Sequence, residues 1–152
     1  MITLYLPKLE DLWFRKLFLS DEKTMSYNHS YGGTITFDEN KWNGWYEYWI
    51  LNNEGKRYYR YLVNKHNEFV GEISYHYDGT YYIANIIIYS KYRNHGYGKE
   101  GIKLLCQAAK ENGIKELFDD IAIDNPAFKL FVDLGFKEIY RTNKIIMVKK
   151  EL

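Results

Sequence analysis

The stretch at residues 86–99 constrains the fold of this chain more than any other. An apolar, β-branched run ends there, and a polar turn containing Gly96 and Gly98 leads directly into a helical pattern. The first N–H groups of a helix lack intrahelical partners and carry partial positive charge. Glycine, which has no Cβ, lets a ligand approach the backbone closely. The stretch therefore predicts an anion site suited to phosphate, with Arg93, His95 and Lys99 as further donors.

A dinucleotide-binding motif is one interpretation of this turn. Residues 96–101 have G-x-G-x-x-G spacing, and Asp119 lies about twenty residues further on, as that motif requires. However, the dinucleotide fold places its first glycine at the very end of the strand, whereas residues 90–95 intervene here. Too little chain follows Gly101 for several further parallel units. This interpretation is disfavoured, and a purely structural glycine turn also remains open.

Composition limits the class of protein. The chain has 152 residues, enough for one domain with a real core. Its 21 basic and 20 acidic residues give no strong net field, which disfavours bulk nucleic-acid binding. The single cysteine, Cys106, fits a helical apolar face as a small core residue. No signal-peptide pattern and no apolar run near membrane-span length occurs, so we expect a cytoplasmic protein without a membrane partner.

Hydrophobic periodicity and turn residues divide the chain into short elements. Strands are expected at residues 1–6, 57–63, 68–77, 80–89, 115–123, 136–140 and 144–149. Helices are expected around residues 9–17, after a capping box at Thr36-Phe37-Asp38-Glu39, over residues 98–112, and after Asn125-Pro126. In the first helix, the residues that recur at helical spacing are Leu9, Leu12, Trp13, Lys16 and Leu17.

Alternation predicts which side chains share a face of the strand at residues 68–77. One face should carry Val70, Glu72, Ser74 and His76, and the other Phe69, Ile73, Tyr75 and Tyr77. In the second helix, an aromatic stripe recurs at helical spacing, which is more typical of a core face than of a ligand site. Its members are Trp42, Trp45, Tyr46 and Trp49.

Three segments resemble the GCN5-related N-acetyltransferase (GNAT) family. Arg93-x-x-Gly96-x-Gly98 is similar to its R/Q-x-x-G-x-G/A signature, and residues 70–73 to its V/I-G-x-I strand. Residues 124–136 look like its N-x-x-A-x-x-L-Y-x-x-x-G-F segment. The resemblance implies one domain, residues 1–152, with an α+β (mixed α/β) fold. It implies a central, mostly antiparallel twisted sheet of six to seven strands flanked by about four helices.

This chain departs from the family pattern at two positions. Asn125 stands one residue closer to Gly135 than the pattern has it, so either Asp124 takes the asparagine's place or the helix begins one residue later. The family's frequent tyrosine, whose phenol is thought to protonate the departing thiolate, is Phe131 here. Phe131 cannot donate a proton, so another group, water or no general acid must serve.

The resemblance implies acetyl-CoA as cosubstrate and no metal. Its pyrophosphate would contact the turn formed by Arg93, Asn94, His95, Gly96, Tyr97, Gly98 and Lys99. Its amide-rich pantetheine arm would pair like an added strand with the backbone of Ile86, Ile87 and Ile88. Asn125, Phe128 and Phe131 would contact the cofactor from the other side, although Asn125 fits a plain helix cap equally well.

The implied reaction is direct transfer of the acetyl group to a primary amine of a small molecule or a protein. Because the amine must first lose a proton, a carboxylate near the acetyl group would assist. Glu72, mid-strand beside the expected cofactor strand, is the first candidate. Asp120 and its neighbour Asp119 are the second, and His76 could assist Glu72. A solvated sheet residue is the competing interpretation of Glu72.

The acceptor side would come from the loop at residues 20–31 and the second helix. Tyr27, Tyr31 and Trp42 are candidates to line it, which would suit a cationic or aromatic acceptor. Because Phe131 lacks a proton to give, a non-catalytic acyl-CoA-binding or sensing domain is the alternative function. The expected partners are acetyl-CoA and the acceptor, in a monomer or a homodimer.

Overall fold

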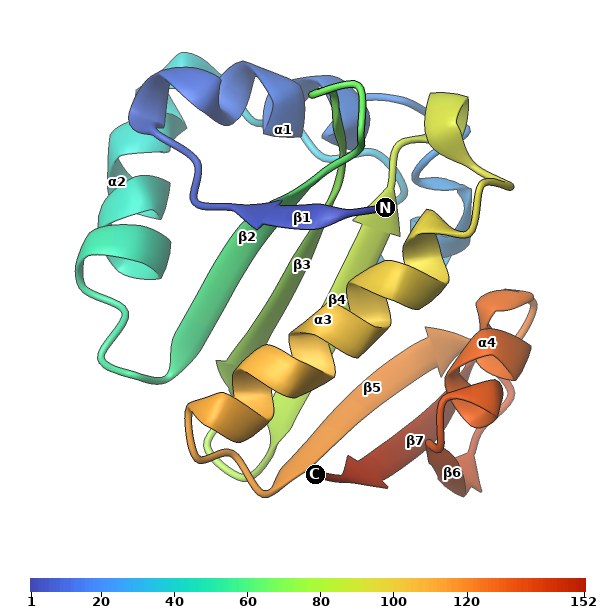
Figure 1. Ribbon diagram of the computed structural model, residues 1–152. Helices are drawn as coiled ribbons and strands as arrows, with labels where there is room; N and C mark the ends of the chain where they lie inside the picture. Colours follow the sequence, from blue (N-terminus) through green and yellow to red (C-terminus); the bar gives the residue numbers. More distant parts are fainter.

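The chain forms one seven-stranded sheet with helices on both faces. The computed structural model describes the backbone of residues 1–152 and every side chain except those of residues 30 and 31. The strand order is β1-β2-β3-β4-β5-β7-β6 (Figure 1). The strands are β1 (Thr3–Tyr5), β2 (Arg57–Val63), β3 (Phe69–Tyr77), β4 (Tyr82–Ile88), β5 (Glu116–Ala122), β6 (Lys137–Arg141) and β7 (Ile145–Glu151). The α-helices are α1 (Leu12–Leu19), α2 (Trp42–Tyr46), α3 (Tyr97–Glu111) and α4 (Ala127–Asp133).

Short 3-10 and π-helical segments adjoin some of these helices or lie in the loops between elements. A 3-10 turn, η1 (Leu9–Asp11), precedes α1, and η2 (Ser26–Tyr31) lies in the loop after it. Another turn, η3 (Glu39–Lys41), precedes α2, which continues as the π-helical η4 (Glu47–Leu51). The last, η5 (Ser90–Tyr92), lies between β4 and α3. The predicted strands and helices are thus all present, with ends that differ by one or a few residues.

Strands β2, β3 and β4 form the predicted antiparallel meander, and residues 78–81 close its second hairpin. A β-bulge corrects the predicted faces of β3. Leu62 pairs with Gly71 and Val63 with Phe69, so Val70 is an extra residue on β3. Because one extra residue reverses the alternation, Val70 packs with Ile73 in one core, while Phe69 joins the opposite core.

The sheet opens between its two middle strands. β4 and β5 run parallel and pair at Ile83 and Phe118, near the start of each strand. Beyond that point the two strands diverge, and α3 crosses in front of the gap as the connection between them (Figure 1). The gap matters for function because the backbone edge of β4 beyond Ile83 has no strand paired to it on that side.

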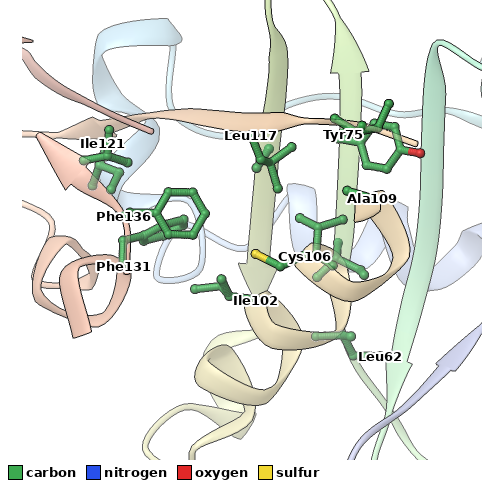
Figure 2. Close-up of a cluster of buried hydrophobic side chains, with 14 of the residues drawn as sticks. Leu62, Tyr75, Ile102, Cys106, Ala109, Leu117, Ile121, Phe131 and Phe136 are labelled. Carbon is green, nitrogen blue, oxygen red and sulfur yellow. The ribbon is translucent and has the colours of Figure 1, made fainter. Parts of the chain in front are cut away.

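The larger core lies between the sheet and helices α3 and α4. Figure 2 shows α3 residues Ile102 and Cys106 facing Leu117 of β5, with Phe131 of α4 beside Phe136. Cys106 is buried there as the sequence predicted. Gly101 allows α3 to approach the sheet, because an added Cβ would lie 2.8 Å from a Leu62 methyl and 2.9 Å from an Ile86 methyl.

The second core lies on the opposite face and is strongly aromatic. Phe14 and Phe18 of α1 pack there with Tyr59 and Tyr61 of β2. The predicted apolar stripe of the first helix was therefore only partly correct: Leu12 is buried, but Trp13 and Leu17 are exposed. The aromatic residues that interrupt that stripe face the core instead.

The predicted capping box of the second helix was wrong. The first helical turn begins at Glu39 with Asp38 at its cap, and no side chain caps it. The segment before it is held extended instead. Ile35 N–H donates to the Leu19 carbonyl, and the Trp42 indole donates to the Phe37 carbonyl. Burial of Phe37 in the aromatic core therefore outweighs the local capping preference.

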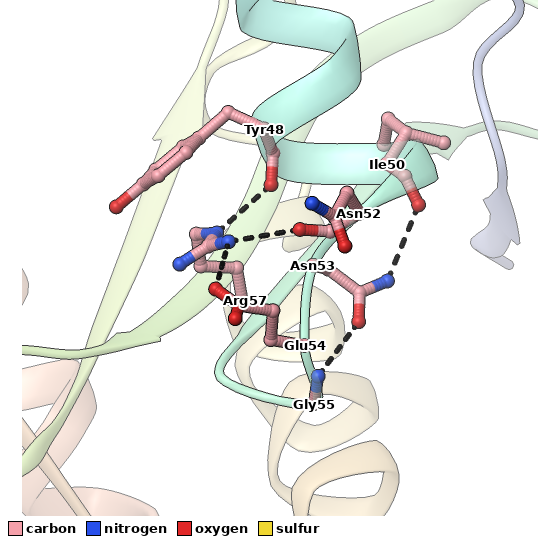
Figure 3. Close-up of polar contacts among 7 residues, drawn as sticks. All are labelled: Tyr48, Ile50, Asn52, Asn53, Glu54, Gly55 and Arg57. Atoms are coloured by element: carbon pink, nitrogen blue, oxygen red, sulfur yellow. Dashed lines mark hydrogen bonds and ion pairs between the residues drawn. The ribbon is translucent and has the colours of Figure 1, made fainter.

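A cluster of hydrogen bonds lies at the end of the second helical segment and includes Tyr48 (Figure 3). The Arg57 guanidinium donates to the Tyr48 and Asn52 carbonyls at 2.8 and 2.9 Å and lies 3.6 Å from the Tyr48 ring centroid. The Asn53 amide donates to the Ile50 carbonyl and accepts from Gly55 N–H. These bonds satisfy carbonyls that a helix end leaves unpaired.

Candidate functional site

A cavity of about 870 Å³ passes through the sheet where β4 and β5 part. This volume lies within the range of small-molecule sites. Its α3 side is lined by residues 93, 94 and 96–99 of the turn, by Ile86 and Ile88, and by Asn125 and Phe131. Its α1 side is lined by Arg15, Tyr27, Trp45, Trp49, Tyr59, Glu72, His76 and Asn85. We refer below to these two groups as the α3 side and the α1 side.

The turn before α3 presents a row of backbone donors. Asn94 and Gly96 adopt left-handed conformations, with φ of +67° and +78°, and α3 begins at Tyr97. Glu100 N–H donates to the Gly96 carbonyl. In the part of the chain that the structure describes, no protein group accepts a hydrogen bond from the N–H groups of residues 94–99. Several free donors at the positive end of a fifteen-residue helix have the chemistry that an anion requires.

Two of the predicted side-chain donors in this turn are used by the protein itself. The Arg93 guanidinium donates to the carbonyls of Lys23 and Thr24 at 3.1 and 2.8 Å. His95 stacks on Tyr97, and its Nδ1 lies 2.8 Å from the Arg93 carbonyl; its side chain is not part of the cavity lining. Lys99 does line the cavity. Anion binding at this turn therefore rests chiefly on the backbone.

A hydrogen-bonded cluster ties the turn to the loop that follows α1. The Asp21 carboxylate accepts hydrogen bonds from Thr24 and from the Ser90 hydroxyl, the latter at 2.7 Å. Ser90 N–H donates to the Thr24 hydroxyl at 2.9 Å. The bonds from Thr24 and Ser90 lower the pKa of Asp21, so the cluster is held by a carboxylate. The two sides of the cavity are thereby joined at one end.

The α1 side contains a buried polar cluster around Glu72. Its Oε1 accepts from the Tyr59 hydroxyl at 2.7 Å, and its Oε2 accepts from the Asn85 amide at 2.8 Å. Arg15 Nε lies 3.4 Å from Oε1. Burial raises the pKa of the Glu72 carboxyl, while Arg15, Tyr59 and Asn85 oppose that rise by stabilising the carboxylate. Glu72 is therefore not the solvated sheet residue considered above.

Adjacent aspartates of β5 lie on opposite faces of the sheet. Asp119 alternates with Leu117 and Ile121, which pack in the α3 core, so Asp120 points to the other face. Both line the cavity. Burial, and to a lesser extent the neighbouring Asp120 charge, raises the pKa of Asp119 well above its usual value. A carboxyl group with such a raised pKa in a cavity is typical of a functional site.

The remaining predicted residues divide between cavity and surroundings. Tyr27, Asn125 and Phe131 line the cavity, but Trp42 and Phe128 do not. Trp42 donates to the Phe37 carbonyl behind the α1 side, and Phe128 lies under the Arg141 guanidinium. The side chain of Tyr31 lies outside the described residues.

The structure places Asn125, not Asp124, in the cavity wall, with α4 beginning at Ala127. The Asn125 amide oxygen accepts a hydrogen bond from Ala127 N–H, which leaves its amide nitrogen for a ligand. Asp124 instead pairs with His29 at the surface.

Sequence analysis missed the side chains that complete the α1 side. They come from five elements along the chain: Arg15 from α1, Trp45 from α2, Trp49 from η4, Tyr59 from β2 and Asn85 from β4. One signal was available: Arg15 is a charged residue directly beside Phe14, on a helix whose Phe14 and Phe18 face the core. For Tyr59 and Asn85, the sequence alone contains no comparable signal.

Comparison with known proteins identifies the family. The model of the acetyltransferase (GNAT) domain matches residues 2–137. The chain belongs to the GNAT family. No curated protein matches the sequence at a significant level. The match and the seven-stranded sheet confirm the predicted family and the predicted GNAT-like fold.

Solved GNAT structures share this fold at low sequence identity. An N-acetyltransferase from Staphylococcus aureus Mu50 aligns with a TM-score of 0.79 at 16% identity, covering 99% of this chain and 98% of that one. The PaiA N-acetyltransferase from Thermoplasma acidophilum, solved with coenzyme A, gives 0.73 at 14%, covering 100% and 99%. The spermidine N-acetyltransferase from Vibrio cholerae, solved with CoA and spermine, gives 0.79 at 15%, covering 99% and 95%.

Two further features concern the residues that the structure describes. Among them, no helix is long and apolar enough to cross a membrane. The same residues contain no cluster of three or more histidine, cysteine, aspartate or glutamate side chains placed to hold a metal ion.

Proposed function

We propose that this GNAT domain transfers the acetyl group of acetyl-CoA directly to a primary amine inside the cavity. The observation that carries the proposal is the row of unpartnered N–H groups at residues 94–99, which opens onto a cavity that passes through the sheet. Such donors fit a pyrophosphate, and each favourable helix-end contact contributes about 0.3–1 kcal/mol. The two neighbours solved with CoA support the choice of cofactor.

The cofactor would extend from the turn into the gap between β4 and β5. The unpaired edge of β4 at residues 86–88 can receive the amides of the pantetheine arm as an added strand would. Asn125 would donate from the opposite wall, and Phe131 would pack against the arm. The thioester would then lie between the α3 side and the α1 side, because the arm enters from one and the acceptor from the other.

Glu72 is the proposed general base. A primary amine with a lysine-like pKa of about 10.4 is neutral in only about one molecule per thousand near pH 7. A buried carboxylate whose pKa is raised is a stronger base than an exposed one, and such a base contributes about 10²–10⁴-fold to the rate. Asp120, on the same face of the sheet, is the second candidate.

The proposed chemical step needs only the amine, the thioester, one carboxylate and water. The ammonium gives one proton to the carboxylate, directly or through water, and the amine nitrogen then attacks the thioester carbon. The C–N bond forms and the C–S bond breaks, and the nitrogen loses its second proton as the amide forms. That proton, passed through water, neutralises the departing CoA thiolate, and the carboxyl group later returns the first proton to solvent. Phe131 has no proton to give, so it serves only as an apolar wall.

The test is to mix the protein with acetyl-CoA and a panel of amines and to follow release of free thiol. Turnover with at least one amine, together with CoA binding by calorimetry, is the expected result. Phe131 and the two hydrogen bonds that Glu72 already accepts favour one alternative, a non-catalytic acyl-CoA sensor. Binding of CoA without turnover across the panel would support the sensor, and absence of CoA binding would refute both.

A further inference from the structure

Arg15 is held rigidly on the α1 side of the cavity. The centre of its guanidinium lies 4.7 Å from the Phe37 ring centroid and 4.7 Å from that of Trp45. Trp45 in turn packs edge-on against Tyr59, the donor to Glu72. A planar cation fixed between two aromatic rings has lost its rotamer freedom before any ligand arrives.

The protein uses little of the hydrogen-bonding capacity of this guanidinium. Its ion pair is with Glu72, where Nε lies 3.4 Å from Oε1, too far for a strong hydrogen bond. Nε is buried without a hydrogen-bond partner, and the Arg15 side chain lines the cavity. Arginine has five donors in a fork that matches a carboxylate. A buried guanidinium donor without a partner, on a side chain that lines a cavity, indicates that a ligand supplies the acceptor.

We propose that the acceptor is a small amino acid, bound through its own carboxylate by Arg15. The inference rests on the proposed acetyltransferase function and names its substrate class. Arg15 and Glu72 are neighbours, so one ligand can place its carboxylate on the guanidinium and its amine beside the Glu72 carboxylate. In an α-amino acid these two groups are carried on one carbon.

The charges of the α1 side favour this class over a polycation. The positive charge of Arg15 repels a second cation, and it offsets the attraction that Glu72 alone would exert. The faces of Phe37 and Trp45, which a cationic acceptor would use, are already covered by Arg15. An amino acid therefore differs from the cationic or aromatic acceptor that the sequence suggested, and from the spermine in the Vibrio cholerae structure.

The first experiment compares matched acceptors. Each of the twenty common L-amino acids is assayed beside the amine that its decarboxylation gives, such as phenylalanine beside phenethylamine, with thiol release as the readout. We expect at least one amino acid to be acetylated with a kcat/KM about 100-fold or more above that of its amine, because the amine leaves Arg15 unpaired.

The second experiment replaces the Arg15 guanidinium. Arg15→Met should raise the KM for the preferred amino acid about 10- to 100-fold, the loss of a charge-assisted pair, and leave CoA affinity unchanged. Arg15→Lys keeps the charge but not the planar, five-donor geometry, so its KM should lie between those of the wild type and Arg15→Met. Arg60→Met is the control, because Arg60 also stacks on an aromatic ring, Tyr58 at 4.3 Å, outside this cavity. Thermal melts confirm that each variant is folded.

The outcomes separate this inference from the proposed function. If amines without a carboxylate turn over as well as amino acids, or if Arg15→Met lowers the rate with both members of a pair equally, the amino-acid assignment is overturned while acetyl transfer stands. If CoA binds and no member of either set reacts, both are overturned.

Discussion

The two sides of the cavity are built from different parts of the polypeptide. The α3 side presents backbone donors from one continuous turn, residues 94–99. The α1 side is built from side chains, with Arg15, Tyr59, Glu72 and Asn85 coming from α1, β2, β3 and β4. A backbone site requires only a local conformation, whereas a side-chain site depends on the packing of distant elements.

The largest expected effect tests the backbone side. Gly96→Val forces a β-branched residue into a conformation with φ of +78°, a strain of about 1–3 kcal/mol, so the turn must distort. We expect CoA affinity measured by calorimetry to fall about 10- to 100-fold. Gly79→Val is the control, since Gly79 has φ of +103° in a hairpin that is not part of the cavity lining. If the two variants bind CoA with equal affinity, the turn at residues 94–99 does not hold the cofactor.

The next effect tests the side-chain side. Glu72→Gln should lower kcat about 10²-fold or more while leaving CoA affinity near that of the wild type. Because burial raises the pKa of Glu72, the wild-type kcat should rise with pH through a midpoint above the usual glutamate value, as the carboxylate forms. The variant should lose that limb of the profile. Glu116→Gln, at a surface pair with Lys149, is the control; an unchanged profile for Glu72→Gln would exclude Glu72 as the base.

The third prediction concerns the effect of Asp119 on the pH dependence of folding stability. The folded state raises the pKa of Asp119, so folding favours its protonated form. The protein should therefore lose stability as pH rises from about 3.9, the unfolded value, through the folded pKa. Asp119→Asn should be more stable than the wild type at neutral pH by roughly 1–3 kcal/mol, and the gain should vanish near pH 4. Thermal melts across pH measure this, with the exposed Asp133→Asn as control; a pH-independent gain would contradict it.

The smallest expected effect is that of Trp42→Phe, because Trp42 lies behind the α1 side and does not line the cavity. Trp42 supports this side from behind, through its hydrogen bond to the Phe37 carbonyl. Trp42→Phe should cost about 1 kcal/mol of stability, the usual value for one hydrogen bond, and leave the acceptor KM within about twofold. The equivalent change at Trp45, which covers Arg15, should raise the acceptor KM clearly. If both variants affect KM alike, Trp42 belongs to the site after all.

Sequence reasoning succeeded where the signal was local. The meander, the turn at residues 93–98 and α3 each follow from contiguous residues, and each is present. It failed where packing overrode a local pattern. The bulge at Val70 exchanged the predicted faces at one end of β3, and burial of Phe37 displaced the expected capping box. In α1, Phe14 and Phe18 face the aromatic core in preference to Trp13 and Leu17.

The sequence by itself determined the family, the order of the elements and the glycine turn, because these depend on neighbours along the chain. Only the tertiary structure decided which side chains share the cavity. Tyr59 and Glu72 are hydrogen-bonded because β2 and β3 are paired in one register, and Arg15 reaches them because α1 packs across that face. A charge acquires its chemistry from what surrounds it, and those surroundings are assembled from residues that are far apart in the sequence.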